Sequence, residues 1–312
     1  MKRKMLNVPK GGYDGMKGFT IVEFLVAGLL SVIVLIAVVS SYFTSRKLND
    51  AANERLAIQQ DLRNAATLIV RDARMAGSFG CFNMSEHTEK DVVFGVTQKK
   101  PLFSLKKGNS TNKLIPIAES PNIGYQGFTQ RLNALIFQYG IDDANASAET
   151  TVVSSCGAIS KPGKQIPTLE DAKKELKIQD SDKEQNGNIA RQRHVVNAYA
   201  VGRFGNNEEG LFRFQLDDKG EWGNPQLLAK KVKRMDVRYI YVSGCPEDED
   251  AGKEEQFKYT GKFDGSVTPA GVEVLLDSGS DAKIAASSDN IIYAYRINAT
   301  IRGGNVCANR TL

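Results

Sequence analysis

The sequence predicts an α+β protein in which one long N-terminal helix precedes an antiparallel β-sheet domain. Residues 19–76 combine an apolar run with an amphipathic helical pattern and contain no proline. From residue 77 onward, short β-rich runs alternate with Gly, Asn, Asp and Pro, a pattern typical of strands joined by turns. A chain of 312 residues is long enough to bury a core in such a domain.

The overall composition is that of a globular protein, with 25% charged and 41% hydrophobic residues. These values argue against a largely disordered chain and against a membrane protein with many spans. The formal net charge is +5, but residues 1–18 carry five basic side chains and one acidic side chain, a net +4. Residues 19–312 are therefore close to +1, and no nucleic-acid partner is expected.

The apolar run occupies residues 19–39 and contains Glu23 as its one charged residue. A helix of this length can cross a bilayer. We expect residues 19–40 to form a transmembrane part of the helix and residues 41–76 to continue it as an amphipathic part. In the second part, small and apolar residues recur at helical spacing, namely Ala51, Ile58, Leu62, Ala65, Ile69 and Ala76.

Gly77 and Gly80 are expected to end the helix, and residues 77–312 to form the β-rich head domain. Within the head, residues 168–178 have a helical pattern with Thr168 as N-cap and Asp171 in the capping-box position. A turn is expected at residues 217–220. The clearest predicted strands are 134–139, 194–201, 211–216, 235–242, 272–276 and 291–301.

The order of basic and apolar segments at the N-terminus differs from that of a secretory signal, which places its apolar segment before the cleavage site. Here the basic stretch ends at Lys17 and Gly18, and the apolar helix follows. A cut between Gly18 and Phe19 would leave the helix in the mature protein. We therefore interpret residues 1–18 as a cleaved leader whose lysines keep the N-terminus in the cytoplasm.

Glu23 is the informative residue of the apolar run. A carboxylate within a membrane helix costs roughly 2.5 to 3.5 kcal/mol on insertion scales and tends to mark a functional position. Cleavage before Phe19 would create a cationic amine four positions before Glu23 on the same helical face. In a bundle, the amine of a neighbouring helix would neutralise Glu23 and fix the axial register.

The run Lys17-Gly18-Phe19-Thr20-Ile21-Val22-Glu23, followed by the apolar helix, resembles the type III signal of type IV prepilins and of type II secretion pseudopilins. The competing interpretation is a single-pass anchor with a chance glutamate. Parts of the later sequence resemble the large minor pilins of the PilW/PilJ type, namely residues 198–201, 211–214, 225–228, 232, 235–239 and 293–297.

This resemblance implies a type IV pilin-like fold and a non-enzymatic subunit that helps to start pilus assembly at or near the fibre tip. It also implies cleavage by prepilin peptidase between Gly18 and Phe19, N-methylation of Phe19, and a role for Glu23 in subunit assembly. Two alternatives stay open: a J-like pseudopilin of type II secretion, and a surface-displayed pilin for adhesion or DNA uptake. The leader is long for this class, and Met5 and Met16 are alternative starts.

The resemblance also implies partners and a location. The partners are other minor pilins and the major pilin through the N-terminal helices, prepilin peptidase, the inner-membrane assembly platform and a tip adhesin. Before assembly the chain would span the inner membrane once, with its N-terminus in the cytoplasm and its head in the periplasm. It would then join a pilus fibre on the cell surface.

The four cysteines are widely spaced and none belongs to a CxxC pair. In an exported domain, an even number of such cysteines indicates two disulfides. We favour Cys81 with Cys156 and Cys245 with Cys307, and a crossed pairing such as Cys81 with Cys245 stays open. In the chain-entropy model each closure would stabilise the fold by roughly 4 kcal/mol.

No pattern indicates an enzyme, a cofactor or a metal site. There is no GxSxG motif, and His194, beside Arg193, is expected to be a strand-edge residue. The acidic residues 246–255 lack the spacing of a calcium loop and are expected to form a solvated loop. The one basic cluster is expected at a strand edge and not in a nucleic-acid surface; it comprises Lys230, Lys231, Lys233 and Arg234.

Overall fold

The structure is a computed structural model of the chain. It describes residues 18, 20–93, 113–143, 145–179, 181–182, 188–206, 209–243, 256–277 and 295–301. The chain divides into two compact units, Met1–Leu56 and Ala57–Leu312. The described part of the first unit is helical, and the second unit combines the end of the same helix with β-sheets, so the fold is α+β as predicted.

Helix α1 extends from Ile21 to Met75, close to the predicted bounds. Among the described residues it is the one helix that is long and apolar enough to cross a membrane, and none of its apolar window is buried. After α1, Gly77 has a φ of 82° and Gly80 a φ of 65°. Glycine adopts this left-handed backbone without a steric cost, which explains why the helix ends here as predicted.

The larger sheet of the second unit has nine strands. They are β3 (Val92–Val93), β4 (Ile117–Ser120), β5 (Phe128–Gln130), β6 (Ala134–Asp142), β7 (Thr151–Ser154), β8 (Ile159–Ser160), β9 (Ala190–Phe204), β10 (Gly210–Leu216) and β11 (Trp222–Lys230). The main order is β11-β10-β9-β7-β8-β3, β5 and β6 also pair with β9, and β4 pairs with β6. The pairs are antiparallel except β3 with β8, which is parallel.

That parallel pair corrects the expectation of a purely antiparallel architecture. Parallel neighbours require a long connection between them, and the chain forms β4 to β7 before it returns as β8 beside β3. The pairing involves two residues in each strand. No local pattern in so short a segment distinguishes the two orientations.

The smaller sheet has four antiparallel strands in the order β13-β12-β14-β15. Its strands are β12 (Arg234–Ser243), β13 (Gln256–Thr260), β14 (Gly271–Asp277) and β15 (Tyr295–Thr300). A two-stranded hairpin of β1 (Ser78–Phe79) and β2 (Phe82–Asn83) follows α1, and two 3-10 turns, Met84–Glu86 and Glu89–Asp91, follow the hairpin.

The predicted strands are present with small shifts in their bounds, although residues 291–294 of the last one lie outside the described residues. The largest shift is in β9, which extends well beyond the predicted 194–201 at both ends. Its polar start pairs with β6 and β7, and its end pairs with β5 and β10.

The predicted short helix is α2 (Leu169–Leu176), where Asp171 N donates to the Thr168 side chain at 3.1 Å. The predicted turn closes where Gly220 N donates to Asp217 O.

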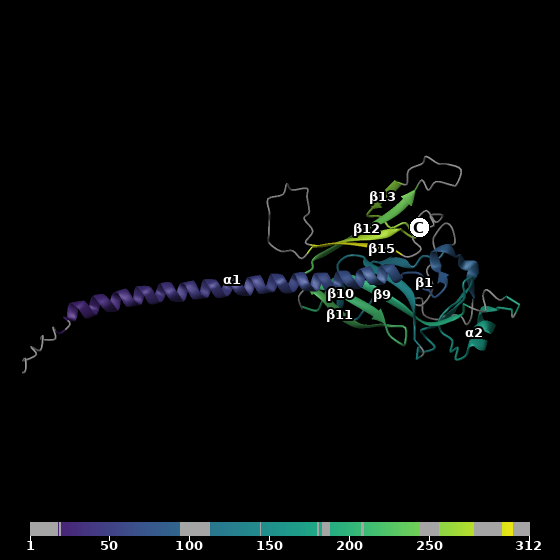
Figure 1. Cartoon of the computed structure of the whole chain (residues 1–312), viewed down its shortest axis with the longest axis horizontal. Helices are drawn as coiled ribbons and strands as arrows, with labels where there is room; N and C mark the ends of the chain where they lie inside the picture. Colours follow the sequence, from purple (N-terminus) through teal and green to yellow (C-terminus); the bar gives the residue numbers. More distant parts are fainter. Residues whose placement is uncertain are drawn as a thin grey trace, which may run out of the picture. The chain divides into compact units, whose positions relative to one another are not determined.

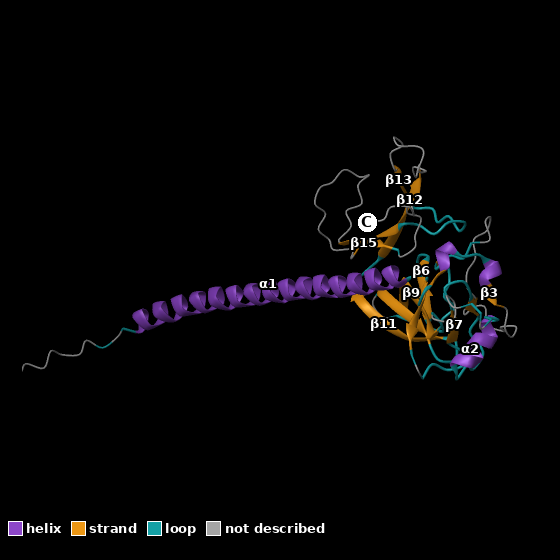
Figure 2. Cartoon of the chain, turned by 45° about the vertical axis from the view of Figure 1, so that its right-hand side comes forward, coloured by secondary structure: helices purple, strands orange, loops and turns teal. Residues whose placement is uncertain are grey.

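Within the second unit, the C-terminal part of α1 lies between the two sheets (Figures 1 and 2). The predicted stripe is confirmed from Ile58 onward, because Leu62, Ala65, Ile69 and Ala76 are buried and Ile58 is partly buried, whereas Ala51 is exposed. Their core partners come from both sheets, including Phe137, Tyr199, Leu211, Tyr239, Val272, Val274 and Ile297.

The opposite face of the nine-stranded sheet is also covered, and the position of His194 within β9, with its ring 5.6 Å from that of Phe79, corrects the prediction for this residue. An aromatic cluster that includes Phe128, Phe204, Phe212 and Phe214 packs on that face. His194 lies inside β9, is 1% exposed, and has its Nε2 atom 3.1 Å from Gln138 Oε1. Burial lowers the pKa of His194 to about 3, so its ring is neutral at physiological pH.

Candidate functional site

The predicted cleavage site immediately precedes α1. Gly18 is exposed, and a Cβ atom added to it would meet no atom within 4 Å. The fold therefore sets no packing requirement for glycine at this position. Phe19, the predicted site of cleavage and N-methylation, lies outside the described residues.

Glu23 caps the start of α1 together with Thr20. Thr20 N and Thr20 Oγ1 each donate to Glu23 Oε2 at 3.0 Å, and Glu23 N donates to Thr20 Oγ1 at 3.3 Å. This reciprocal arrangement is a capping box, which satisfies backbone donors that the first helical turn leaves free. The sequence already contained the Thr-x-x-Glu signal. Our sequence interpretation considered only a charge partner for Glu23.

The apolar surface of α1 between Ile21 and Phe43 is exposed on every side of the helix. Its large side chains retain 48 to 81% of their accessible surface. A helix that is apolar all round is normally buried in a membrane or among other helices. The residues are Ile21, Val22, Phe24, Leu25, Val26, Leu29, Leu30, Val32, Ile33, Val34, Leu35, Ile36, Val38, Val39, Tyr42 and Phe43.

A buried carboxylate connects the C-terminal part of α1 to the nine-stranded sheet. Asp72 is 0% exposed. Tyr199 Oη donates to Asp72 Oδ2 at 2.6 Å, and Asn197 Nδ2 donates to the same atom at 2.7 Å. Tyr139 Oη donates to Asp72 Oδ1 at 3.0 Å, and Arg213 Nη2 lies 3.5 Å from Oδ2. We call these five residues the Asp72 cluster.

A nearby positive charge and two protonated tyrosine hydroxyls stabilise the Asp72 carboxylate. Arg71, whose side chain is half exposed, places Nε and Nη2 at 3.1 and 3.0 Å from Asp72 Oδ1. Burial, and then the neighbouring Asp72 charge, raises the pKa of Tyr139 to about 12 and also raises the pKa of Tyr199. Both hydroxyls are therefore protonated donors at neutral pH. Removing one partner of such a buried charged group destabilises a fold by about 3 to 5 kcal/mol.

The Asp72 cluster was not among the sequence predictions, although one signal for it was present. Asp72 follows Ile69 by three positions and precedes Ala76 by four, so it falls on the apolar stripe of α1. A charged residue on a stripe that faces a core requires polar partners from the elements opposite. Those partners come from β6, β9 and β10, and the helical pattern alone does not identify them.

The predicted disulfide between Cys81 and Cys156 is present, with Cα atoms 4.7 Å apart. It joins the β1–β2 hairpin to the segment between β7 and β8, and it closes a separation of 75 residues. Cys245 and Cys307 lie outside the described residues, so their predicted pairing stays a prediction.

Those of the remaining candidate residues that the structure describes are not brought together into a site. The basic cluster occupies the connection between β11 and β12, where Lys231 has a φ of 61° and Arg234 pairs with Asp236. The acidic residues 246–255 lie outside the described residues. Among the residues that the structure describes, no group of three His, Cys, Asp or Glu side chains could hold a metal ion.

Comparison of the chain with models of protein families, with curated proteins and with solved structures finds no match. Two arrangements in the described residues have functional chemistry. One is an exposed apolar helix with a charged cap at its start, and the other is a head that holds the end of the same helix through the Asp72 cluster.

Proposed function

We propose that this chain is a minor pilin, a non-enzymatic subunit that helps to start type IV pilus assembly and lies at or near the fibre tip. The observation that carries the proposal is the Lys17-Gly18-Phe19 junction directly before a helix that is apolar on every side and has Glu23 in its first turn. Entry of such a helix into a membrane or a bundle of similar helices removes apolar surface from water and so lowers the free energy.

The proposal assigns the apolar surface two successive environments. Before assembly, α1 spans the inner membrane once, with the leader in the cytoplasm and the β-rich head in the periplasm. Prepilin peptidase then cuts between Gly18 and Phe19. After extraction by the assembly platform, the helices of other minor pilins and the major pilin replace the lipid around α1, and the head contributes to the tip, where an adhesin can join it.

The capping box supports the assembly role of Glu23. In the uncleaved chain Glu23 Oε2 lies 3.0 Å from Thr20 N, one residue away from the amine that cleavage would create at Phe19. The carboxylate is thus already at the end of the helix where that cation would form. Pairing with the amine of its own helix or of a neighbour would lower the cost of a charge within a bundle and would set the register.

Deletion of the gene in its own host tests the proposal. We expect a sharp fall in the number of surface fibres, with the major pilin still made and processed, because the first subunits no longer meet efficiently. When fibre retraction is also disabled, some fibres should return as slow spontaneous starts accumulate. Normal fibre numbers in the single deletion would contradict the initiation role.

The same strain separates the proposal from the type II secretion alternative, which shares the leader and the apolar helix. A J-like pseudopilin would be needed for export of secreted proteins and not for surface pili. Lost secretion with unchanged pili would therefore favour the pseudopilin. Lost pili with unchanged secretion is the result that we expect.

A further inference from the structure

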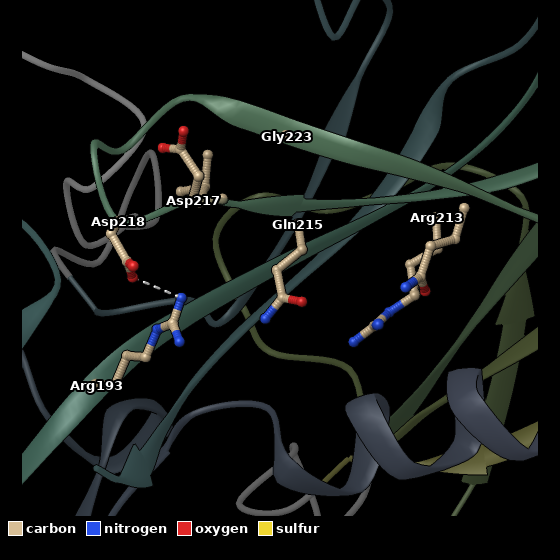
Figure 3. Close-up of a pocket in the computed structure, with 8 residues that line it drawn as sticks. Arg193, Arg213, Gln215, Asp217, Asp218 and Gly223 are labelled. Carbon is tan, nitrogen blue, oxygen red and sulfur yellow. Dashed lines mark ion pairs between the residues drawn. The ribbon is translucent and has the colours of Figure 1, made fainter. Parts of the chain in front are cut away.

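A polar pocket of about 240 Å³ lies on the nine-stranded sheet, beside the Asp72 cluster (Figure 3). Its wall is built by β9, β10, β11 and the turn that joins β10 to β11. No role assigned so far uses this pocket. The lining residues are Arg193, Arg213, Gln215, Leu216, Asp217, Asp218, Gly223 and Gln226.

Arg213 provides a buried positive charge at one end of the pocket. The residue is 9% exposed, and its Nη2 atom reaches Asp72 only at 3.5 Å. Asp72 already pairs more closely with Arg71, so two guanidinium groups share one buried carboxylate. Within the described part of the chain, the buried Arg213 Nε has no hydrogen-bond partner. A buried cation with a free donor is unfavourable unless an acceptor compensates it.

The acidic side chains of the pocket do not supply that acceptor. Asp218 pairs with Arg193 at 2.9 Å at the other end. Asp217 Oδ1 accepts from two backbone N–H groups of the turn, and Figure 3 shows this carboxylate turned away from the arginines. Asp217 is also four residues beyond Arg213, about 13 Å away along an extended chain.

Gln215 lies between the two arginines, and its amide extends to the same side of β10 as the Arg213 guanidinium group (Figure 3). It pairs in the ladder with Asn197, so it stands on the face of the sheet that carries the Asp72 cluster. An amide nitrogen and a guanidinium group, here those of Gln215 and Arg213, are two kinds of donor that a carboxylate accepts from.

We propose that this pocket binds a ligand carboxylate, which accepts hydrogen bonds from Arg213 and from the Gln215 amide. The carboxylate belongs either to a small free acid or to an acidic side chain of a protein partner, and the chemistry of recognition is the same for both. This binding site goes beyond the proposed assembly role and involves none of the residues on which that role rests.

The test uses the full-length chain purified in detergent and two probes at constant ionic strength. One probe is acetate, and the other is an N-acetylated, C-amidated alanine peptide with a single glutamate; the same peptide with glutamine is its control. Binding is followed by saturation-transfer NMR of the probe. We expect saturable binding of acetate with a dissociation constant on the order of 1 mM, as suits so small a ligand. Stronger binding of the glutamate peptide than of acetate would assign the site to a protein partner, and the reverse to a free acid.

Three variants locate the site. Gln215→Leu should weaken binding about tenfold or more, because it removes a hydrogen bond to a charged group. Arg213→Gln should abolish binding, with circular dichroism to check that the head is folded. Arg203→Gln is the matched control, since Arg203 also lies on β9 but is exposed and does not line the pocket, and binding should change less than threefold, or about 0.6 kcal/mol. Absence of saturable binding, an unchanged Gln215→Leu variant, or loss of binding in Arg203→Gln would overturn the proposal.

Discussion

The two halves of α1 belong to one continuous helix but are stabilised in opposite ways. Between Ile21 and Phe43 the surface is apolar all round and exposed, whereas from Leu62 to Ala76 a single apolar stripe is buried and carries one charge, Asp72. The second half is therefore stabilised by the head, whereas the first half has no such cover among the described residues. Mutations of the same kind should have different consequences in the two halves.

The largest expected effect is that of Asp72→Ala. It leaves Arg213 and the two tyrosine hydroxyls buried without their shared acceptor, so the free energy of unfolding should fall by about 3 to 5 kcal/mol. Urea unfolding of the full-length protein in detergent measures this change. The matched control is Asp50→Asn on the exposed part of α1, which should change stability by about 0.5 kcal/mol or less. Equal effects at the two positions would contradict the role of the Asp72 cluster.

Removal of the Cys81–Cys156 disulfide should have the next largest effect on stability. The disulfide restricts the unfolded chain of the head and does not involve the apolar half of α1. The double substitution to serine should destabilise the head by about 2 to 4 kcal/mol, as is typical of such cross-links. Thermal unfolding of the full-length protein provides the measurement. Unfolding at the same temperature with and without the disulfide would show that the link adds nothing to stability.

A conservative pair of substitutions compares the two halves directly. Ile69→Val removes one methylene group from the buried stripe and should cost about 1 kcal/mol of head stability. Leu35→Val makes the same kind of change at a side chain that is 61% exposed, and head stability should stay the same. A loss of head stability in Leu35→Val would mean that the apolar half also packs on the head.

Glu23→Gln should likewise leave head stability unchanged, and its effect should appear in assembly instead. The variant keeps a side chain of the same size and can still accept one capping bond from Thr20. Cleavage and membrane insertion should be unchanged, and less of the variant should be recovered in sheared fibres, measured by quantitative immunoblot. Equal recovery would remove Glu23 as the residue that sets the register.

Elements with a strong local pattern could be predicted from the sequence. The length of α1 follows from its unbroken apolar and amphipathic run, its end from Gly77 and Gly80, and α2 from the Thr168 cap. Six strands were located because apolar and β-branched residues are concentrated in them. The pairing of Cys81 with Cys156 was favoured but not determined by the sequence, and the structure confirms it.

Features that depend on contacts between distant residues could not be predicted in the same way. In the Asp72 cluster the partners of Asp72 are 67 to 141 positions away in the sequence. His194 was expected at an edge because Arg193 precedes it, but β9 is a central strand covered on both faces. The spacing of apolar residues in a segment predicts a strand, but it does not predict whether that strand lies at the edge or in the centre of a sheet.

The most direct test of the account is the mass and N-terminal sequence of the protein isolated from its native membranes. If the apolar half of α1 is a processed assembly segment, the mature chain begins at Phe19, carries one methyl group on its amine, and retains the whole helix. Gly18→Glu should keep the leader attached without unfolding the head, because a Cβ atom at that position lies within 4 Å of no atom of the described residues. A native chain that still carries its leader, or that lacks the apolar helix, would contradict the account.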